Sequence, residues 1–129
     1  YEIAAMRAQP GGGTIVNVSS VVGPYLRVPG MAAYGAAKAA VSALTRTAAL
    51  EYIRDGVRIN AVTPGPMDTP MSLRPGETEA ERAERVRREL PAGRVGSLAE
   101  FSAAVRYLAS PESAFTVGHD LVLDGGATA

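Results

Sequence analysis

The chain lacks several features that would indicate particular kinds of site, namely cysteine, an excess of charge of one sign and long apolar runs. It has no cysteine, which excludes a disulfide framework and a thiolate metal site and is typical of a cytoplasmic protein. Its 13 basic and 13 acidic residues cancel to a formal net charge of zero, so no basic surface is available for nucleic acid or an anionic membrane. No apolar run approaches the length of a membrane span. We therefore expect a cytoplasmic protein that binds neither nucleic acid nor membranes.

Lysine is also scarce, because it occurs once, as Lys38, while the other 12 basic residues are arginines. Lys38 follows Tyr34 by four residues in the sequence YGAAK, and this spacing places both side chains on one face of a helix. An ammonium group beside a phenol stabilises the phenolate, so the pair is suited to acid–base catalysis near neutral pH. The alternative is a tyrosine and a lysine on the solvated face of an ordinary helix. The absence of any other lysine weighs against that alternative.

The remaining composition predicts a single folded domain, with 47% apolar and 20% charged residues among 129. Segments rich in β-branched residues alternate with helical patterns, which predicts an α/β fold with parallel strands. Within the longest helix, we expect Val41, Leu44, Ala48 and Tyr52 to form the buried stripe. The expected strands are residues 14–19, 57–62 and 119–123, and the expected helices are residues 1–9, 32–53, 77–90 and 98–109, the last opened by a capping box at Ser97.

Four short motifs follow one another along the chain. A strand ends in Ser19-Ser20, YGAAK follows, a second strand runs into NAVTPG and then Thr69, and the chain closes on LVLDGG. Together they resemble the classical short-chain dehydrogenase/reductase family over nearly all 129 residues, but only over the second half of a family member. The resemblance implies a Rossmann-like doubly wound parallel sheet. Residues 1–129 would form its C-terminal half, a partial NAD(P)-binding domain with about three strands and three to four helices.

The resemblance implies three catalytic residues. Tyr34 would exchange a proton with the substrate oxygen, Lys38 would stabilise the phenolate and hold the nicotinamide ribose, and Ser20 would position the carbonyl or alcohol. Successive strand residues point to opposite faces, so Ser19 and Ser20 cannot both face one site unless the strand has ended, and the family's pattern selects Ser20. The alternative for Ser20 is a strand-end hydroxyl that ties off a loop. Ser19 and Asn17 are interpreted as structural.

The resemblance also implies NAD or NADP as cofactor, with no preference readable, and no metal. Pro64-Gly65 lies at the carboxyl end of a strand, where α/β sheets bind ligands. Met67 stands where the family usually has Val or Ile, and a backbone contact survives that change. Taken alone, Thr69 is compatible with an ordinary loop residue. The implied cofactor contacts are Tyr34, Lys38, Pro64, Gly65, Met67 and Thr69.

The implied substrate is a small carbonyl compound or alcohol. In the family, the loop at residues 23–30 borders the substrate pocket, so Tyr25, Leu26 and Met31 are either substrate contacts or loop anchors, and both readings stay open. Residues 72–96 correspond to the family's substrate lid, and their charged helix with its thin apolar stripe is typical of a mobile segment. The family uses the helix at residues 32–53 in a subunit interface, which implies a homodimer or homotetramer.

Two other functions are alternatives to this one. A non-catalytic binding protein on the same fold is one, since fold does not determine function, although the complete set of Ser20, Tyr34 and Lys38 argues against it. A Ser-His-Asp hydrolase would need His119, the only histidine, and no serine lies in a G-x-S-x-G motif. The chain contains no glycine-rich phosphate-binding turn. We therefore expect a truncated chain, with an open edge on strand 14–19, that is inactive alone.

Overall fold

Three parallel strands form the sheet of the computed structural model, which describes residues 1–129. They are β1 (Gly13–Val18), β2 (Val57–Pro64) and β3 (Asp120–Leu123), in the spatial order β1-β2-β3. The predicted α/β fold with parallel strands is therefore confirmed. β2 extends two residues beyond its expected end because these residues continue the ladder with β3.

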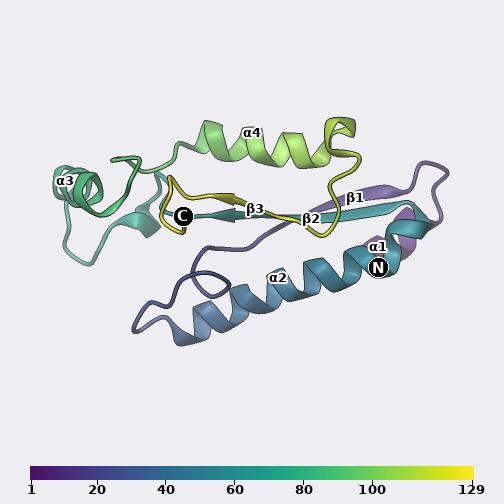
Figure 1. Ribbon diagram of the computed structural model, residues 1–129, viewed down its shortest axis with the longest axis horizontal. Helices are drawn as coiled ribbons and strands as arrows, with labels where there is room; N and C mark the ends of the chain where they lie inside the picture. Colours follow the sequence, from purple (N-terminus) through teal and green to yellow (C-terminus); the bar gives the residue numbers. More distant parts are fainter.

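Helices cover both faces of this sheet, and one further helix lies beyond its end. Figure 1 shows α1 and α2 on one face, α4 on the other, and α3 past the carboxyl ends of the strands. Ligands of open α/β sheets bind at this carboxyl end. The helices are α1 (Glu2–Arg7), α2 (Ala32–Tyr52), α3 (Glu79–Glu89) and α4 (Leu98–Ala109), with short 3₁₀ turns at Ile53–Asp55, Pro70–Ser72 and Pro111–Ser113.

Both helices after β2 begin at a capping box. The Ser97 hydroxyl accepts a hydrogen bond from the Glu100 amide, and the Glu100 carboxylate accepts one from the Ser97 amide, which confirms the predicted start of α4. Thr78 and Glu81 make the same reciprocal pair at α3. α3 therefore begins at Glu79, two residues later than predicted.

The core lies between β2 and α2. Val57 and Ile59 of β2 are 0% and 1% exposed, and Ala49 of α2 is 0% exposed. On the opposite face, Leu108 of α4 is fully buried. β2 is covered on both faces, and its buried residues include the polar side chains Arg58 and Asn60, which hydrogen-bond to groups outside the strand.

The predicted apolar stripe of α2 is wrong in part. Leu44 is 64% exposed, whereas Ser42 and Thr45 are fully buried beside Ala48. The Ser42 and Thr45 hydroxyls form hydrogen bonds with Ser19 and Asn17 at the end of β1, so these polar residues carry their partners into the interior. Small side chains on this face let α2 lie close to the sheet.

A glycine pair fixes the start of α2 against the loop that follows β1. Gly23 has a φ of +111°, and a Cβ at Gly23 would collide with the carbonyl oxygen of Gly35. No other residue can occupy this position without displacing the helix backbone. The contact sets the loop after Ser20 beside the first turn of α2, which carries Tyr34.

β1 lies at an edge of the sheet. It pairs with β2 alone, so its other edge presents unpaired backbone groups, as expected for strand 14–19. None of the helices has the length and apolar character needed to cross a membrane.

Candidate active site

Tyr34 and Lys38 lie one turn apart near the start of α2, as their spacing predicts. The Lys38 ammonium nitrogen is 5.8 Å from the centroid of the Tyr34 ring, a distance at which a cation and an aromatic face attract each other. The same ammonium donates a hydrogen bond to the Val18 carbonyl, 2.9 Å away. Lys38 thus joins the start of α2 to the end of β1 and holds its charge beside the phenol.

Ser19 and Ser20 point in different directions, and each has a different kind of neighbour. The Ser19 hydroxyl donates to the Lys38 carbonyl at 3.0 Å and lies 2.8 Å from the Ser42 hydroxyl, so it fastens α2 to the sheet. The Ser20 hydroxyl accepts a hydrogen bond from the Val22 amide at 3.2 Å and lies in a pocket with Tyr34. Both partners of the Ser19 hydroxyl therefore belong to α2, and Ser20 is the serine that faces the pocket.

This pocket has a volume of about 500 Å³, which falls within the usual range of about 300–1,000 Å³ for small-molecule sites. Ser20 and Tyr34 form one wall. The turn after β2 forms another wall through Pro64, Gly65 and Met67. The structure thus brings together six of the seven proposed site residues, namely Ser20, Tyr34, Pro64, Gly65, Met67 and Thr69, while Lys38 lies behind Tyr34.

The loop before α2 contributes two of its three candidate substrate contacts. Leu26 and Met31 line the pocket, but Tyr25 does not. The Tyr25 hydroxyl instead lies 3.4 Å from Asp120, whose carboxylate pairs with Arg46 at 2.7 Å. Burial, followed by the neighbouring Asp120 charge, raises the pKa of Tyr25 above its usual value. Tyr25 is therefore an anchor that holds this loop to β3.

A second hollow of about 600 Å³ lies on the other side of the same loop. Gly23, Arg27, Ala36 and Ala39 are among its lining residues, but neither Ser20 nor Tyr34 is. It holds no group suited to acid–base chemistry, so we assign the candidate active site to the smaller pocket. His119, which a hydrolase would need, is exposed at the start of β3 and lines neither hollow. No cluster of His, Asp or Glu could hold a metal ion.

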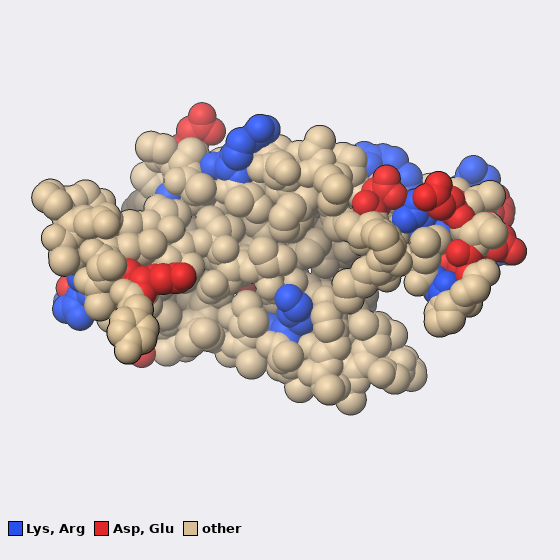
Figure 2. Space-filling model, turned by 180° about the vertical axis from the view of Figure 1, so that it is seen from behind, with Lys and Arg blue, Asp and Glu red and all other residues tan.

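The remaining wall comes from residues 72–96, which we call the lid segment, and from Met71 just before it. Figure 2 shows charged side chains gathered at this end of the molecule, beside a hollow, next to a largely uncharged face. Sequence reasoning missed the lid residues that line the pocket. The signals for those on and just after α3 were its thin apolar stripe, with Val86 and Leu90, and its interleaved arginines and glutamates. The pocket residues of this wall are Met71, Ser72, Arg85, Val86, Glu89 and Leu90.

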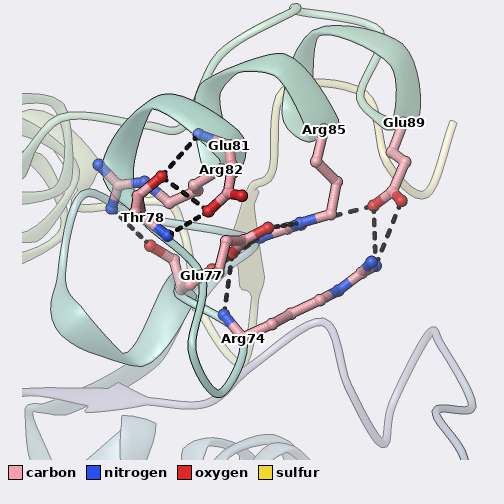
Figure 3. Close-up of polar contacts among 8 residues, drawn as sticks. Arg74, Glu77, Thr78, Glu81, Arg82, Arg85 and Glu89 are labelled. Atoms are coloured by element: carbon pink, nitrogen blue, oxygen red, sulfur yellow. Dashed lines mark hydrogen bonds and ion pairs between the residues drawn. The ribbon is translucent and has the colours of Figure 1, made fainter.

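Ion pairs hold α3 in place (Figure 3). Arg82 donates to the Ser72 hydroxyl and to the Asp68 carboxylate, each at 2.8 Å. Arg85 donates two hydrogen bonds to Glu77, at 2.6 and 2.8 Å. The hydrogen bonds from Arg85, followed by that from the Arg74 amide, lower the pKa of Glu77 from 4.5 to about 2. These contacts link α3 to the segment that carries Thr69.

Comparison with known proteins places this geometry in a family. Residues 2–128 match the family described as enoyl-(acyl carrier protein) reductase. The chain is 41% identical to cyclohexanol dehydrogenase of Acinetobacter sp., covering 99% of this chain and 48% of that protein. It is 43% identical to cis-4-hydroxycyclohexanecarboxylate dehydrogenase of Sinomonas cyclohexanicum, covering 92% of this chain and 46% of that protein.

Solved structures agree with the sequence comparison. A gluconate 5-dehydrogenase from Burkholderia cenocepacia, in complex with NADP and tartrate, is 34% identical and superposes with a TM-score of 0.85 over 97% of this chain and 48% of its own. The chain spans about half the length of the curated relatives it matches. The three strands thus form part of a Rossmann-like sheet with helices on both faces, as expected.

Proposed function

Because this chain belongs to the short-chain dehydrogenase/reductase family, we propose that it carries the catalytic half of an NAD(P)-dependent oxidoreductase that interconverts a small alcohol and its carbonyl compound. The observation that carries the proposal is the shared pocket. Ser20 and Tyr34 face the same space as the Pro64-Gly65 turn, at the carboxyl end of the sheet. Tyr34 would then face the oxygen of the substrate, and a cofactor bound at the Pro64-Gly65 turn would face the carbon that carries this oxygen.

Each proposed catalytic residue has a distinct task. Tyr34 would donate its phenolic proton to the carbonyl oxygen, or remove the alcohol proton in the reverse direction. Lys38, fixed by the Val18 carbonyl, would stabilise the phenolate form. Ser20 would hold the substrate oxygen with its hydroxyl, which has only the Val22 amide as a partner within the protein and is therefore free to donate.

The residues of the pocket fit a nicotinamide cofactor. Thr69 lines the pocket, and its hydroxyl makes no hydrogen bond within the protein, so it is available to a polar group of the ligand. Pro64, Gly65 and Met67 would offer a backbone edge to the ring, and Lys38 would contact the ribose. When bound, NADH or NADPH supplies the hydride. The NADP complex of the gluconate 5-dehydrogenase supports this class of cofactor.

Three further roles belong to the same proposal. The relatives named for alcohols support a small-molecule substrate. The lid segment would cover that substrate, since its residues form the pocket wall facing Tyr34. The family resemblance puts α2 in a subunit interface, and Leu44 and Leu50 of this helix are exposed, so we include a homodimer or homotetramer through α2 in the proposal.

The test of the catalytic proposal is Tyr34→Phe, which removes one hydroxyl. We use the term assembled enzyme for a polypeptide that carries this chain behind a nucleotide-binding half of the family. In the assembled enzyme, turnover with NAD(P)⁺ and a secondary alcohol should fall by about 10²–10⁴-fold, with circular dichroism unchanged. Tyr25→Phe, which removes a hydroxyl outside the pocket, is the matched control and should keep most of the turnover. Parent-like turnover in Tyr34→Phe would exclude Tyr34 as the acid, whereas absence of turnover in the parent itself would favour a non-catalytic binding protein on this fold.

We also propose that the 129-residue chain alone is inactive. It contains no glycine-rich turn to hold the dinucleotide phosphates, and one edge of β1 is unpaired. Calorimetric titration of the purified chain with NADH and NADPH should give no binding in the micromolar range, and size-exclusion chromatography should show association. A monodisperse monomer that binds either cofactor at micromolar affinity would contradict this proposal.

A further inference from the structure

The substrate pocket contains very little charge. Of its 19 lining residues, only Arg85 and Glu89 are charged, and both belong to α3. Apart from Tyr34 itself, the uncharged polar side chains of the lining are the hydroxyls of Ser20, Thr69 and Ser72. The rest of the lining is apolar, and its largest side chains come from the loop before α2, from the turn after β2 and from Met71 and the lid segment, namely Leu26, Val28, Met31, Met67, Met71, Val86 and Leu90.

Arg85 is the one cation that could bind an anionic substrate, but its hydrogen-bonding groups are already engaged. It donates two hydrogen bonds to Glu77, one to the Ser72 carbonyl at 3.0 Å and one to Glu89 at 3.4 Å. These bonds use four of the five N–H groups of a guanidinium. The side chains of Arg85 and Glu77 are only 14% and 11% exposed.

Glu89, the acidic residue that lines the pocket, is paired with an arginine that does not line it. Both oxygens of Glu89 accept from Arg74 at 3.2 Å, in addition to the contact with Arg85. Arg74 and Arg85 together balance Glu77 and Glu89, and Figure 3 shows the four side chains as one connected group. Since the pKa of Glu77 is about 2, this carboxylate stays ionised at every physiological pH.

We propose that the pocket selects uncharged, mainly aliphatic ketones and secondary alcohols and rejects carboxylate-bearing analogues, because Glu77 occupies the guanidinium of Arg85 that a substrate carboxylate would need. The inference deepens the proposed function, on which it rests for the reaction. A carboxylate that enters this pocket loses water and finds no free cation, whereas a neutral ring or chain loses little by desolvation. Glu77 and Arg85 would therefore be specificity-determining residues.

Binding of two ligands of the same shape tests the inference without turnover. The ligands are cyclohexanecarboxamide and cyclohexanecarboxylate, titrated into the assembled enzyme with ¹³C-methyl-labelled methionine. Met31, Met67 and Met71 line the pocket and should report binding, whereas Met6 does not line it and serves as an internal control. The amide should bind at least about tenfold more tightly than the carboxylate. Equal binding, a preference for the carboxylate, or no shift with either ligand would overturn the proposal.

The decisive variant is Glu77→Gln, which keeps the shape of the side chain and releases the charge of Arg85. The preference for the amide should shrink by about tenfold or more. Glu84→Gln is the matched control, because Glu84 pairs with Arg87 on the exposed side of the same helix, and its preference should equal that of the parent. Arg85→Met should also keep the preference for the amide, since no cation takes part in neutral binding. An unchanged preference in Glu77→Gln would overturn the assignment.

Turnover separates this inference from the reaction itself. If 4-oxocyclohexanecarboxamide and 4-oxocyclohexanecarboxylate are reduced at the same kcat/KM, the selectivity is wrong while the reaction stands. If neither is reduced but the amide still binds selectively, the reaction is wrong while the selectivity of the pocket stands.

Discussion

The two walls of the candidate active site are built from different interactions. The wall with Ser20 and Tyr34 is supported by α2, β1 and β2, whose packed residues Ala49 and Ile59 are almost completely buried. Its polar contacts, such as that between Ser19 and Ser42, join uncharged groups inside the protein. Salt and pH act weakly on interactions of this kind, so the acid–base residues have a support that stays constant across solution conditions.

The lid wall depends on charge instead. Within α3 only Val86 is buried, and the contacts that fix the helix are those of Arg82 and Arg85 to acidic groups on the preceding segment. The pair of Arg85 and Glu77 is largely buried, but Asp68 and Glu89, the other acidic partners of Arg82 and Arg85, are 61% and 52% exposed. Ion pairs with an exposed partner contribute about 0–1 kcal/mol each and are screened by salt, so we expect this wall to loosen more easily than the other. We call the wall with Ser20 and Tyr34 the constant wall, and we expect the lid wall to move and admit substrate without disturbing the proton donor.

After Tyr34→Phe, the largest effect in the constant wall should come from Lys38→Met. The variant removes the charge beside Tyr34 and the hydrogen bond to the Val18 carbonyl while keeping the length of the side chain. Turnover of the assembled enzyme should fall by about 10²-fold, and the pH–rate profile should move to higher pH because the phenolate loses its neighbouring cation. Lys38→Arg keeps the charge and should shift the profile less. An unchanged profile in Lys38→Met would exclude the proposed role.

Glycine substitutions compare the backbones of the two walls directly. Gly23 and Gly76 both have positive φ, at +111° and +79°, but a Cβ at Gly23 meets the backbone of Gly35, whereas Gly76 in the lid segment has open space around it. Gly23→Ala should lower the free energy of unfolding by about 2 kcal/mol or more, and Gly76→Ala by about 1 kcal/mol. Urea denaturation of the assembled enzyme measures both. Equal losses would mean that the contact between Gly23 and Gly35 adds nothing.

Local signals in the sequence were sufficient to predict much of the constant wall. The spacing of Tyr34 and Lys38 and the capping box at Ser97 depend on residues within one turn of a helix, and both are present in the structure. Neither of these predictions needed knowledge of a partner distant in the chain. The choice of Ser20 over Ser19 came from the family resemblance and not from a local signal, and in the structure Ser20 lines the pocket while Ser19 bonds to α2, both just after the end of β1.

The errors and omissions involve partners that are distant in the chain. The sequence predicts a buried Leu44, but Thr45 is buried in the structure and Leu44 is exposed. Thr45 is buried with its hydrogen-bond partner Asn17, which lies 28 residues away and cannot be identified from the local pattern. Arg58 is 9% exposed within β2, where its guanidinium donates to the Leu108 carbonyl and the Ser113 hydroxyl, about 50 residues away. A polar residue that is satisfied by tertiary contacts has the same local pattern as one on the surface, so its burial has no local signal.

The smallest and most selective effect should come from pH. The pKa of Glu77 lies below its usual value of 4.5, at about 2, chiefly because of the hydrogen bonds from Arg85. A carboxylate with a lowered folded-state pKa stabilises the fold fully above about pH 4.5, and this contribution is lost as the pH falls toward 2. Acid should therefore loosen the lid segment, while the contacts among Ser19, Ser42 and Thr45 contain no titrating group.

Amide NMR spectra recorded from pH 6 to about pH 2 should show signals of α3 changing near the lower limit, before those of β2. In Glu77→Gln this early change should be smaller, because Glu77 no longer titrates while Glu81, whose pKa is also lowered by its hydrogen bonds with Thr78, still does, whereas Glu84→Gln should retain it in full. Simultaneous loss of α3 and β2 in the parent would mean that the two walls are not held independently.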